Sequence, residues 1–161
     1  MGDKLSHTIA EWGDDPDIRA ALAEVCELTG MGFSAVAFVS EDRWIACQVD
    51  DRIEFGMDPG GELEIKKTIC TDVRQCGEAI VIDDTSEDPD WWNHPVPILY
   101  GFKSYLSIPL NLDDGTFFGT LCAIDPRPRD VPLKKRLPDL ESVAQKVARL
   151  LSEKAGKRGA A

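Results

Sequence analysis

Apolar positions follow a helical period near both ends of the chain. Between these two segments most apolar residues occur in short runs that are typical of strands. The first clear helix begins at DDPD (14–17), where an aspartate can cap the first turn and the proline suits its start. Apolar residues then recur at helical spacing until Gly30 ends the pattern. Those residues are Ile18, Ala21, Leu22 and Val25.

Five short runs of β-branched and aromatic residues predict five strands. FSAVAFVS (33–40) and RWIACQV (43–49) are separated by two acidic residues, which indicates a tight hairpin. EAIVIDD (78–84) predicts a single strand. SYLSIPL (104–110) and FFGTLCAID (117–125) flank an acidic turn with glycine, which indicates a second hairpin.

The remaining segments predict further helices. LEIKKTICTDVRQCG (63–77) has apolar residues at four-residue spacing and predicts one or two short helices. An apolar stripe over 135–154, with charges opposite, predicts one amphipathic helix at the C-terminal end. Pro109 cannot donate a backbone hydrogen bond, so we expect it at a strand end, a bulge or an unpaired edge.

This order predicts an α+β domain with a central antiparallel sheet of about five or six strands. The N- and C-terminal helices would cover one face, and the other face needs short helices around Cys70 and the long loop 84–101. We expect one domain over the whole chain, with a core at about 17–151. Residues 1–13 would form a helical extension, and 152–161 a flexible tail.

Composition narrows the possible partners. The chain has 161 residues, 43% of them hydrophobic and 29% charged, which suits one folded domain. A net charge of −11 disfavours nucleic acid and anionic membranes. With no apolar run near membrane length and no export signal, we expect a cytoplasmic protein. The five scattered cysteines are then expected to be thiols rather than a disulfide framework or a zinc site.

Three motifs together resemble the GAF domain, a small sensory module of sensor histidine kinases, cyclic-nucleotide phosphodiesterases, phytochromes and transcriptional regulators. They are TICTDVRQCGEAIVIDD (68–84), YGFKSYLSIPL (100–110) and DGTFFGTLCAIDP (114–126), with a long loop containing DP and HP after the first. The resemblance covers about 17–151 and is closest to input domains of bacterial signalling proteins. It implies a ligand pocket on the sheet face opposite the terminal helices, beneath the short helices and the loop 84–101.

The aromatic residues of that loop are the main candidates for a ligand site. Trp91 and Trp92 would form an aromatic wall, with His94, Tyr100 and Tyr105 supplying polar groups. The alternative is that the indoles fill the pocket themselves. His94 also has the chemistry of an axial haem ligand or a proton switch. The other residues expected at the pocket are Cys70, Asp84, Ser107, Thr120 and Cys122.

Sequence patterns argue against catalysis and against a covalent chromophore. Cys70 aligns with one cysteine of the free methionine-(R)-sulfoxide reductases, but their attacking cysteine has no counterpart around Ile98. Asn93-His94 stands where bilin-binding relatives carry Cys-His, and the NKFDE-like motif of cyclic-nucleotide binders is not found. The acidic run 83–90 lacks EF-hand spacing, so we expect a solvated turn rather than a calcium site.

These observations predict a noncatalytic sensory domain that binds an unidentified small molecule without a cofactor or metal. The alternative is a ligand-free dimerisation adaptor. Methionine sulfoxide reduction and noncovalent chromophore or haem sensing are less favoured. We expect a homodimer through the terminal helices, with 7–12 and 137–151 as candidate surfaces, and a histidine kinase or other signalling protein as partner.

Overall fold

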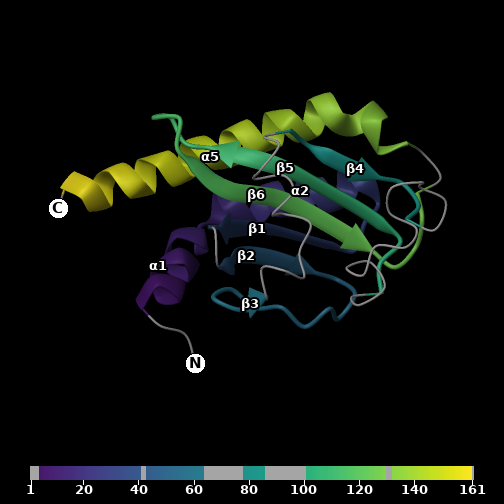
Figure 1. The fold of residues 1–161 in the computed structure, drawn as a ribbon, viewed down its shortest axis with the longest axis horizontal. Helices are drawn as coiled ribbons and strands as arrows, with labels where there is room; N and C mark the ends of the chain where they lie inside the picture. Colours follow the sequence, from purple (N-terminus) through teal and green to yellow (C-terminus); the bar gives the residue numbers. More distant parts are fainter. Residues whose placement is uncertain (1–3, 41–42, 64–77, 86–100, 130–131, 161) are drawn as a thin grey trace.

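The computed structural model describes residues 4–40, 43–63, 78–85, 101–129 and 132–160. Its elements in chain order are α1 (Lys4–Gly13), α2 (Pro16–Thr29), β1 (Phe33–Val39), β2 (Trp44–Asp51), β3 (Glu62–Leu63), β4 (Ile80–Ile82), β5 (Ser104–Asn111), β6 (Phe117–Asp125), the 3-10 helix η2 (Leu133–Arg136) and α5 (Leu137–Ala160). The strands form one antiparallel six-stranded sheet in the order β3-β2-β1-β6-β5-β4 (Figure 1). The predicted α+β fold is therefore confirmed. The short helices expected within 64–77 lie outside the described residues.

Helix α2 begins and ends through the local chemistry that its sequence predicts. The carboxylate of Asp15 accepts the backbone N–H groups of Asp17 at 2.7 Å and Ile18 at 3.4 Å, which satisfies two donors that have no partner inside the helix. At the other end Gly30 adopts φ +72° and donates its N–H to the carbonyl of Cys26 at 2.8 Å. Glycine tolerates this left-handed conformation, so the chain can turn directly into β1.

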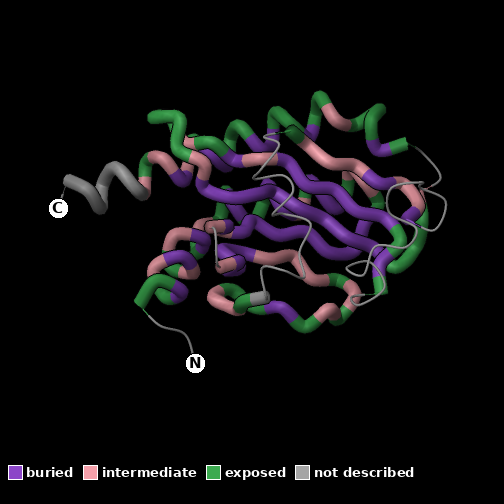
Figure 2. Tube along the Cα trace, viewed as in Figure 1, coloured by how far each residue is buried: buried purple, intermediate pink, exposed green. Residues whose placement is uncertain are grey.

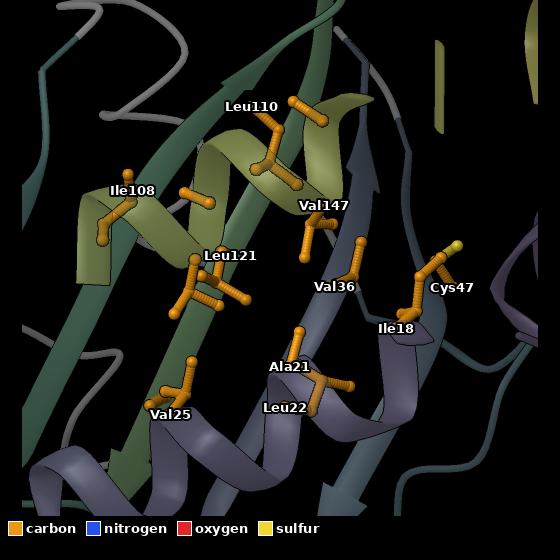
Figure 3. Packing of buried hydrophobic residues seen from close by; sticks show 14 of the residues in the cluster. Ile18, Ala21, Leu22, Val25, Val36, Cys47, Ile108, Leu110, Leu121 and Val147 are labelled. Carbon is orange, nitrogen blue, oxygen red and sulfur yellow. The ribbon is translucent and has the colours of Figure 1, made fainter. Parts of the chain in front are cut away.

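All three α-helices of the described chain pack on the same face of the sheet. Figure 3 shows side chains of α2 and α5 directed at the strands; the labelled ones include Ile18, Leu22 and Val25 of α2, Val147 of α5, and Val36, Leu110 and Leu121 of the sheet. Each fully buried aliphatic side chain contributes about 1.5–3 kcal/mol relative to exposure. The strands are accordingly the most continuously buried part of the molecule (Figure 2).

Helix α1 packs closely against β2 and is hydrogen-bonded to it. The side-chain amide of Gln48 donates to the carbonyl oxygen of Gly13 at 2.9 Å, and the thiol of Cys47 donates to the carbonyl oxygen of Ile9 at 3.2 Å. A Cβ at position 13 would collide with the backbone carbonyl of Cys47, so only glycine permits this approach. Within the stretch 1–13, where a helical extension was expected, Lys4–Gly13 thus forms a helix that packs on the sheet.

Two β-bulges adjust which side chains face the helices. The register passes from Val36 opposite Gln48 to Ala37 opposite Ala46, which leaves Cys47 as an extra residue in β2. Cys47 and Gln48 can therefore both face α1, although they are consecutive. The register between β5 and β6 shifts in the same way, with Phe118 as the extra residue.

Several element boundaries differ from the sequence-based expectation. Strand β3 was not predicted, since two residues carry no periodicity, and β4 is limited to Ile80–Ile82. Pro109 lies inside β5 opposite Thr120, two residues beyond Ser107, the last residue of β5 with a described partner in β4.

The C-terminal helix is longer than expected. Helix α5 continues to Ala160, where a flexible tail was expected from residue 152, and its last turns project past the strands in Figure 1. The lysine, arginine and alanine residues of this stretch favour helix despite two glycines. None of the helices in the described part of the chain combines the length and apolar character needed to span a bilayer.

A small-residue floor on the sheet face opposite the helices

The sheet face opposite the helices carries aligned rows of side chains contributed by neighbouring strands. One row runs from Ile80 of β4 through Ser107 of β5 and Cys122 of β6 to Ala35 of β1. The next row toward the other end of the sheet contains Pro109, Thr120 and Ala37. Side chains in the same row are cross-strand neighbours, so residues distant in sequence form one continuous surface.

Four of the predicted site residues come together on this surface. Ser107 and Cys122 are directly opposite each other, with Tyr105 and Thr120 in the adjoining rows. Their exposed fractions are 5% for Tyr105, 0% for Ser107 and Thr120, and 6% for Cys122. None of the four is without an interaction partner.

Small side chains occupy the centre of this face, and we call them the small-residue floor; the three alanines among them were not predicted as site residues from the sequence. Ala35, Ala37 and Ala46 are each fully buried there and extend the small residues Ser107 and Cys122 across the central strands. The signal was present in SAVAFV (34–39), where small residues occupy alternate positions.

Aromatic residues stand around this floor. Phe33 and Phe55 lie at one end with ring centroids 4.9 Å apart, and Phe102 stacks on Tyr105 with centroids 5.4 Å apart. Trp44 lies toward the other end, where β2 pairs with the last residue of β1. The face therefore has small side chains at its centre and larger aromatic side chains, here called the aromatic rim, toward its two ends.

The other predicted site residues can be placed only in part. Asp84 follows β4, is half-buried and has an interaction partner, but its proposed position at a pocket mouth stays a prediction. Five further candidates lie outside the described residues, namely Cys70, Trp91, Trp92, His94 and Tyr100.

A fully buried carboxylate lies where β6 ends. Asp125 accepts hydrogen bonds from the backbone N–H of Gly32 at 2.9 Å and from the backbone N–H of Arg127 at 2.8 Å. The guanidinium of Arg127 lies 3.0 Å from the carboxylate, and that of Arg129 lies 3.2 Å away. Burial opposes ionisation of Asp125, but these hydrogen bonds and positive charges outweigh it and hold the pKa of the carboxyl below its ordinary value.

The described cysteines are poor candidates for thiol chemistry. Cys26, Cys47 and Cys122 are free thiols and all are buried. Removal from water disfavours the thiolate, which raises the pKa of Cys47 to about 12 and raises the pKa of Cys26 despite a hydrogen bond with Ser34. A nucleophilic cysteine needs the opposite environment.

No group of three or more His, Cys, Asp or Glu side chains that could hold a metal ion occurs among the described residues.

Two hollows lined by described residues lie away from the small-residue floor. One, of about 460 Å³, lies between α5 and the edge of β5 and includes Glu78 and Glu141 in its lining. The other, of about 350 Å³, lies between α2 and α5. Neither contains a predicted site residue.

An antiparallel six-stranded sheet with α-helices on one face and small side chains at the centre of the other defines a domain of the α+β class. The family model of the GAF domain matches residues 18–154. The chain belongs to the GAF domain family, as its motifs led us to expect. No curated protein sequence matches the chain at a significant level.

Solved structures with this fold come from proteins of different activity. The GAF domain of an Acinetobacter phosphoenolpyruvate-protein phosphotransferase is 12% identical, with a TM-score of 0.69 and 99% of each chain covered. The GAF-B domain of DevS from Mycobacterium smegmatis is 16% identical, with a TM-score of 0.66 and coverage of 90% of this chain and 97% of that one. A type II free methionine-R-sulfoxide reductase from Thermoplasma acidophilum is 14% identical, with a TM-score of 0.65 and coverage of 90% and 96%. At these identities the likeness shows the fold alone.

Proposed function

We propose that this GAF domain is a noncatalytic sensory domain that binds a small molecule against the small-residue floor, beneath the segment 84–101. The observation that carries the proposal is the combination of Ala35, Ala37, Ser107 and Cys122 at the centre of one sheet face with aromatic side chains around them. Such a surface offers apolar contact area with few polar groups, which suits a compact, largely apolar ligand with one or two hydrogen-bonding groups.

The loop residues proposed from the sequence would complete the site. Trp91 and Trp92 would close it from above, and His94 and Tyr100 would add polar groups. Cys70 and Asp84 would lie at its border. The ligand would order the loop, and the change would pass through the sheet to the helices on its other face. It can do so only by its differential affinity for the two arrangements.

A homodimer through the terminal helices belongs to the same proposal. The apolar stripe of α5 is used to cover the sheet, since Leu140, Val143, Val147 and Leu151 are all buried. Among the described residues, the hollow between α2 and α5 and helix α1 with its exposed Leu5 are the surfaces that we propose for a second copy. A signalling protein such as a histidine kinase would receive the output.

Two alternatives have specific support. The complete burial of Ser107 and Thr120 favours a ligand-free adaptor whose pocket is filled by its own side chains. The structural likeness to a methionine-R-sulfoxide reductase keeps thiol-dependent reduction as a second alternative, with Cys70 as the residue on which it would depend. The high pKa of Cys47 and the burial of Cys122 count against those two thiols as participants.

Native mass spectrometry of the purified chain, with an absorption spectrum of the same sample, tests the proposal. A retained small molecule, or saturable binding found by titrating a metabolite library against tryptophan fluorescence, supports the sensor. A dimer that binds nothing supports the adaptor. Consumption of free methionine (R)-sulfoxide that disappears in Cys70→Ser would establish the enzyme instead, and a Soret or bilin band would establish a chromophore.

Neighbouring residues of β5 give a matched pair of variants once a ligand is found. Tyr105 is buried on the proposed ligand face, whereas Leu106 is buried against the helices. We expect Tyr105→Leu to weaken binding at least tenfold, because it removes an aromatic rim residue and its hydroxyl, and Leu106→Met to leave affinity unchanged. Equal affinities in the two variants and in Trp91→Leu would show that the site lies elsewhere.

A further inference from the structure

The end of β4 is bonded directly to the segment that leads into α5. The carboxylate of Asp83, the first residue after β4, accepts the backbone N–H of Leu133 in η2 at 2.8 Å. The carbonyl oxygen of Asp83 accepts the backbone N–H of Arg129 at 2.8 Å. The first turn of a helix has N–H groups without internal partners, so Asp83 caps the C-terminal helical segment from a strand that is distant in sequence.

Arg129 extends this connection to the other helix. Its guanidinium donates to the carbonyl of Thr29, the last residue of α2, at 3.0 Å, and lies 3.2 Å from the carboxylate of Asp125. The Arg129 side chain is only 10% exposed, and Asp125 is fully buried. Asp83, Asp125 and Arg129 are here called the Arg129 junction. It joins the ends of β4 and β6 to the end of α2 and the start of η2.

The guanidinium of Arg129 is also incompletely satisfied. Its Nε atom is buried and has no hydrogen-bond partner among the described residues. Buried donors are nearly always paired, so this one marks a place where the side chain is fixed by its outer nitrogens alone.

The opposite ends of α2 and α5 are held by a different contact. Lys154 of α5 pairs at 2.9 Å with Asp15, the residue that caps the start of α2. The ion pair of Lys154 with Asp15 thus joins α2 and α5 at one end, and the Arg129 junction bonds both helical segments to the sheet at the other end. Of these two connections, only the junction contains Asp83, the residue that follows β4.

We propose that the Arg129 junction transmits movement at the end of β4 to both α2 and α5. Asp83 immediately precedes the segment 84–101, so a displacement there would alter the cap on Leu133 and the position of Arg129. The signalling meaning of this link rests on the proposed function, because a ligand beneath 84–101 would supply the displacement. The link itself is a property of the folded chain without ligand.

Hydrogen exchange measured by mass spectrometry on the full chain tests the link through a double-variant cycle. Ile82 is 1% exposed on the proposed ligand face and pairs with Tyr105, so Ile82→Ala loosens the end of β4 while leaving the three side chains of the junction in place. In the otherwise unchanged chain we expect it to speed amide exchange in 132–140 roughly tenfold, the effect of losing about one charge-assisted hydrogen bond. In an Asp83→Ala background it should still speed exchange in 80–85 but add nothing in 132–140.

Two controls separate this effect from general destabilisation. Val39→Ala perturbs the same sheet face at its other end and should leave 132–140 unchanged. Amides of 143–151, in the middle of α5, report global opening. Asp83→Asn retains an acceptor oxygen and should restore part of the coupling. If Ile82→Ala prevents folding, Ile82→Val serves in its place with a smaller effect.

The outcomes distinguish this inference from the proposed function. An equal response of 132–140 to Ile82→Ala in both backgrounds, or no response in either, would overturn the link. A chain that binds a ligand yet shows no such coupling would keep the proposed function and lose this route. Coupling in a chain that binds nothing would support the link and count against the sensor.

Discussion

Replacing Asp125 by asparagine should lower the free energy of unfolding by about 3 kcal/mol. Breaking a buried ion pair costs roughly 3–5 kcal/mol when it leaves an unpaired buried charge. Here the Arg127 side chain is 70% exposed and can be rehydrated, whereas Arg129 is 10% exposed and cannot. Because only the buried charge of Arg129 would lose its partner without gaining water, the expected loss lies at the lower end of that range. With a urea m-value of about 2 kcal/mol/M, the midpoint should fall by about 1.5 M.

The chain contains a matched control for this variant. Asp50 also pairs with an arginine two residues later, with Nε 3.1 Å and a terminal guanidinium nitrogen 3.0 Å from its carboxylate oxygens. That pair is more exposed than Asp125 and Arg129, at 46% for Arg52 and 22% for Asp50, so Asp50→Asn should cost less than about 1 kcal/mol. Equal midpoint shifts for the two variants at unchanged m would refute the argument that burial and Arg129 make Asp125 different.

The pH dependence of the Asp125→Asn effect gives a second check. The folded-state pKa of Asp125 lies below the unfolded value, so its ionisation stabilises the fold above the unfolded pKa. That contribution is lost as the pH falls through the folded pKa. The difference in stability between wild type and variant should therefore be constant near neutral pH and narrow below about pH 4. A difference that widened in acid would contradict the assignment.

Three further predictions follow from individual contacts. A Cβ at Gly119 would collide with a backbone carbonyl of β1, so Gly119→Ala should cost several kcal/mol or abolish the cooperative thermal transition seen by circular dichroism. Lys154→Met should lower the free energy of unfolding by about 1 kcal/mol, because its partner Asp15 is partly buried and the hydrogen bond with Lys154 is the main cause that lowers the pKa of Asp15. In an Asp15→Asn background the same substitution should cause no further loss. The three described cysteines are buried, so no more than two of the five thiols should react rapidly with a disulfide reagent in the folded chain, and all five in denaturant.

Local patterns predicted most of the fold because each rests on residues close in sequence. The aspartate cap before Pro16, the stop at Gly30 and the β-branched and aromatic runs of β1 and β6 correspond directly to the structure. The two-residue strand β3 has no such pattern, and the length of α5 beyond residue 152 depends on helix propensity that two glycines obscure. Boundaries set by weak preferences are the part that sequence alone fixes least well.

The candidate site could be predicted from the sequence only for residues that lie in regular strands. Tyr105 and Ser107 alternate along one strand, so their common face follows from the sequence, whereas their position beside Cys122 depends on the register between strands. The contact of Asp83 with Leu133 joins residues fifty positions apart. The sequence directed attention to Asp84 instead, because no local rule distinguishes two adjacent aspartates after a strand.

The uneven strand lengths of the sheet bear on how the chain behaves at high concentration. In the described part of the chain the four central strands have seven to nine residues, and the outer strands β3 and β4 have two and three. A short outer strand offers few backbone groups as a template for a strand of another molecule, which limits sheet extension and fibril formation. Insertions that lengthen β4 along β5 would enlarge that template, so engineered variants of this domain should keep both borders short.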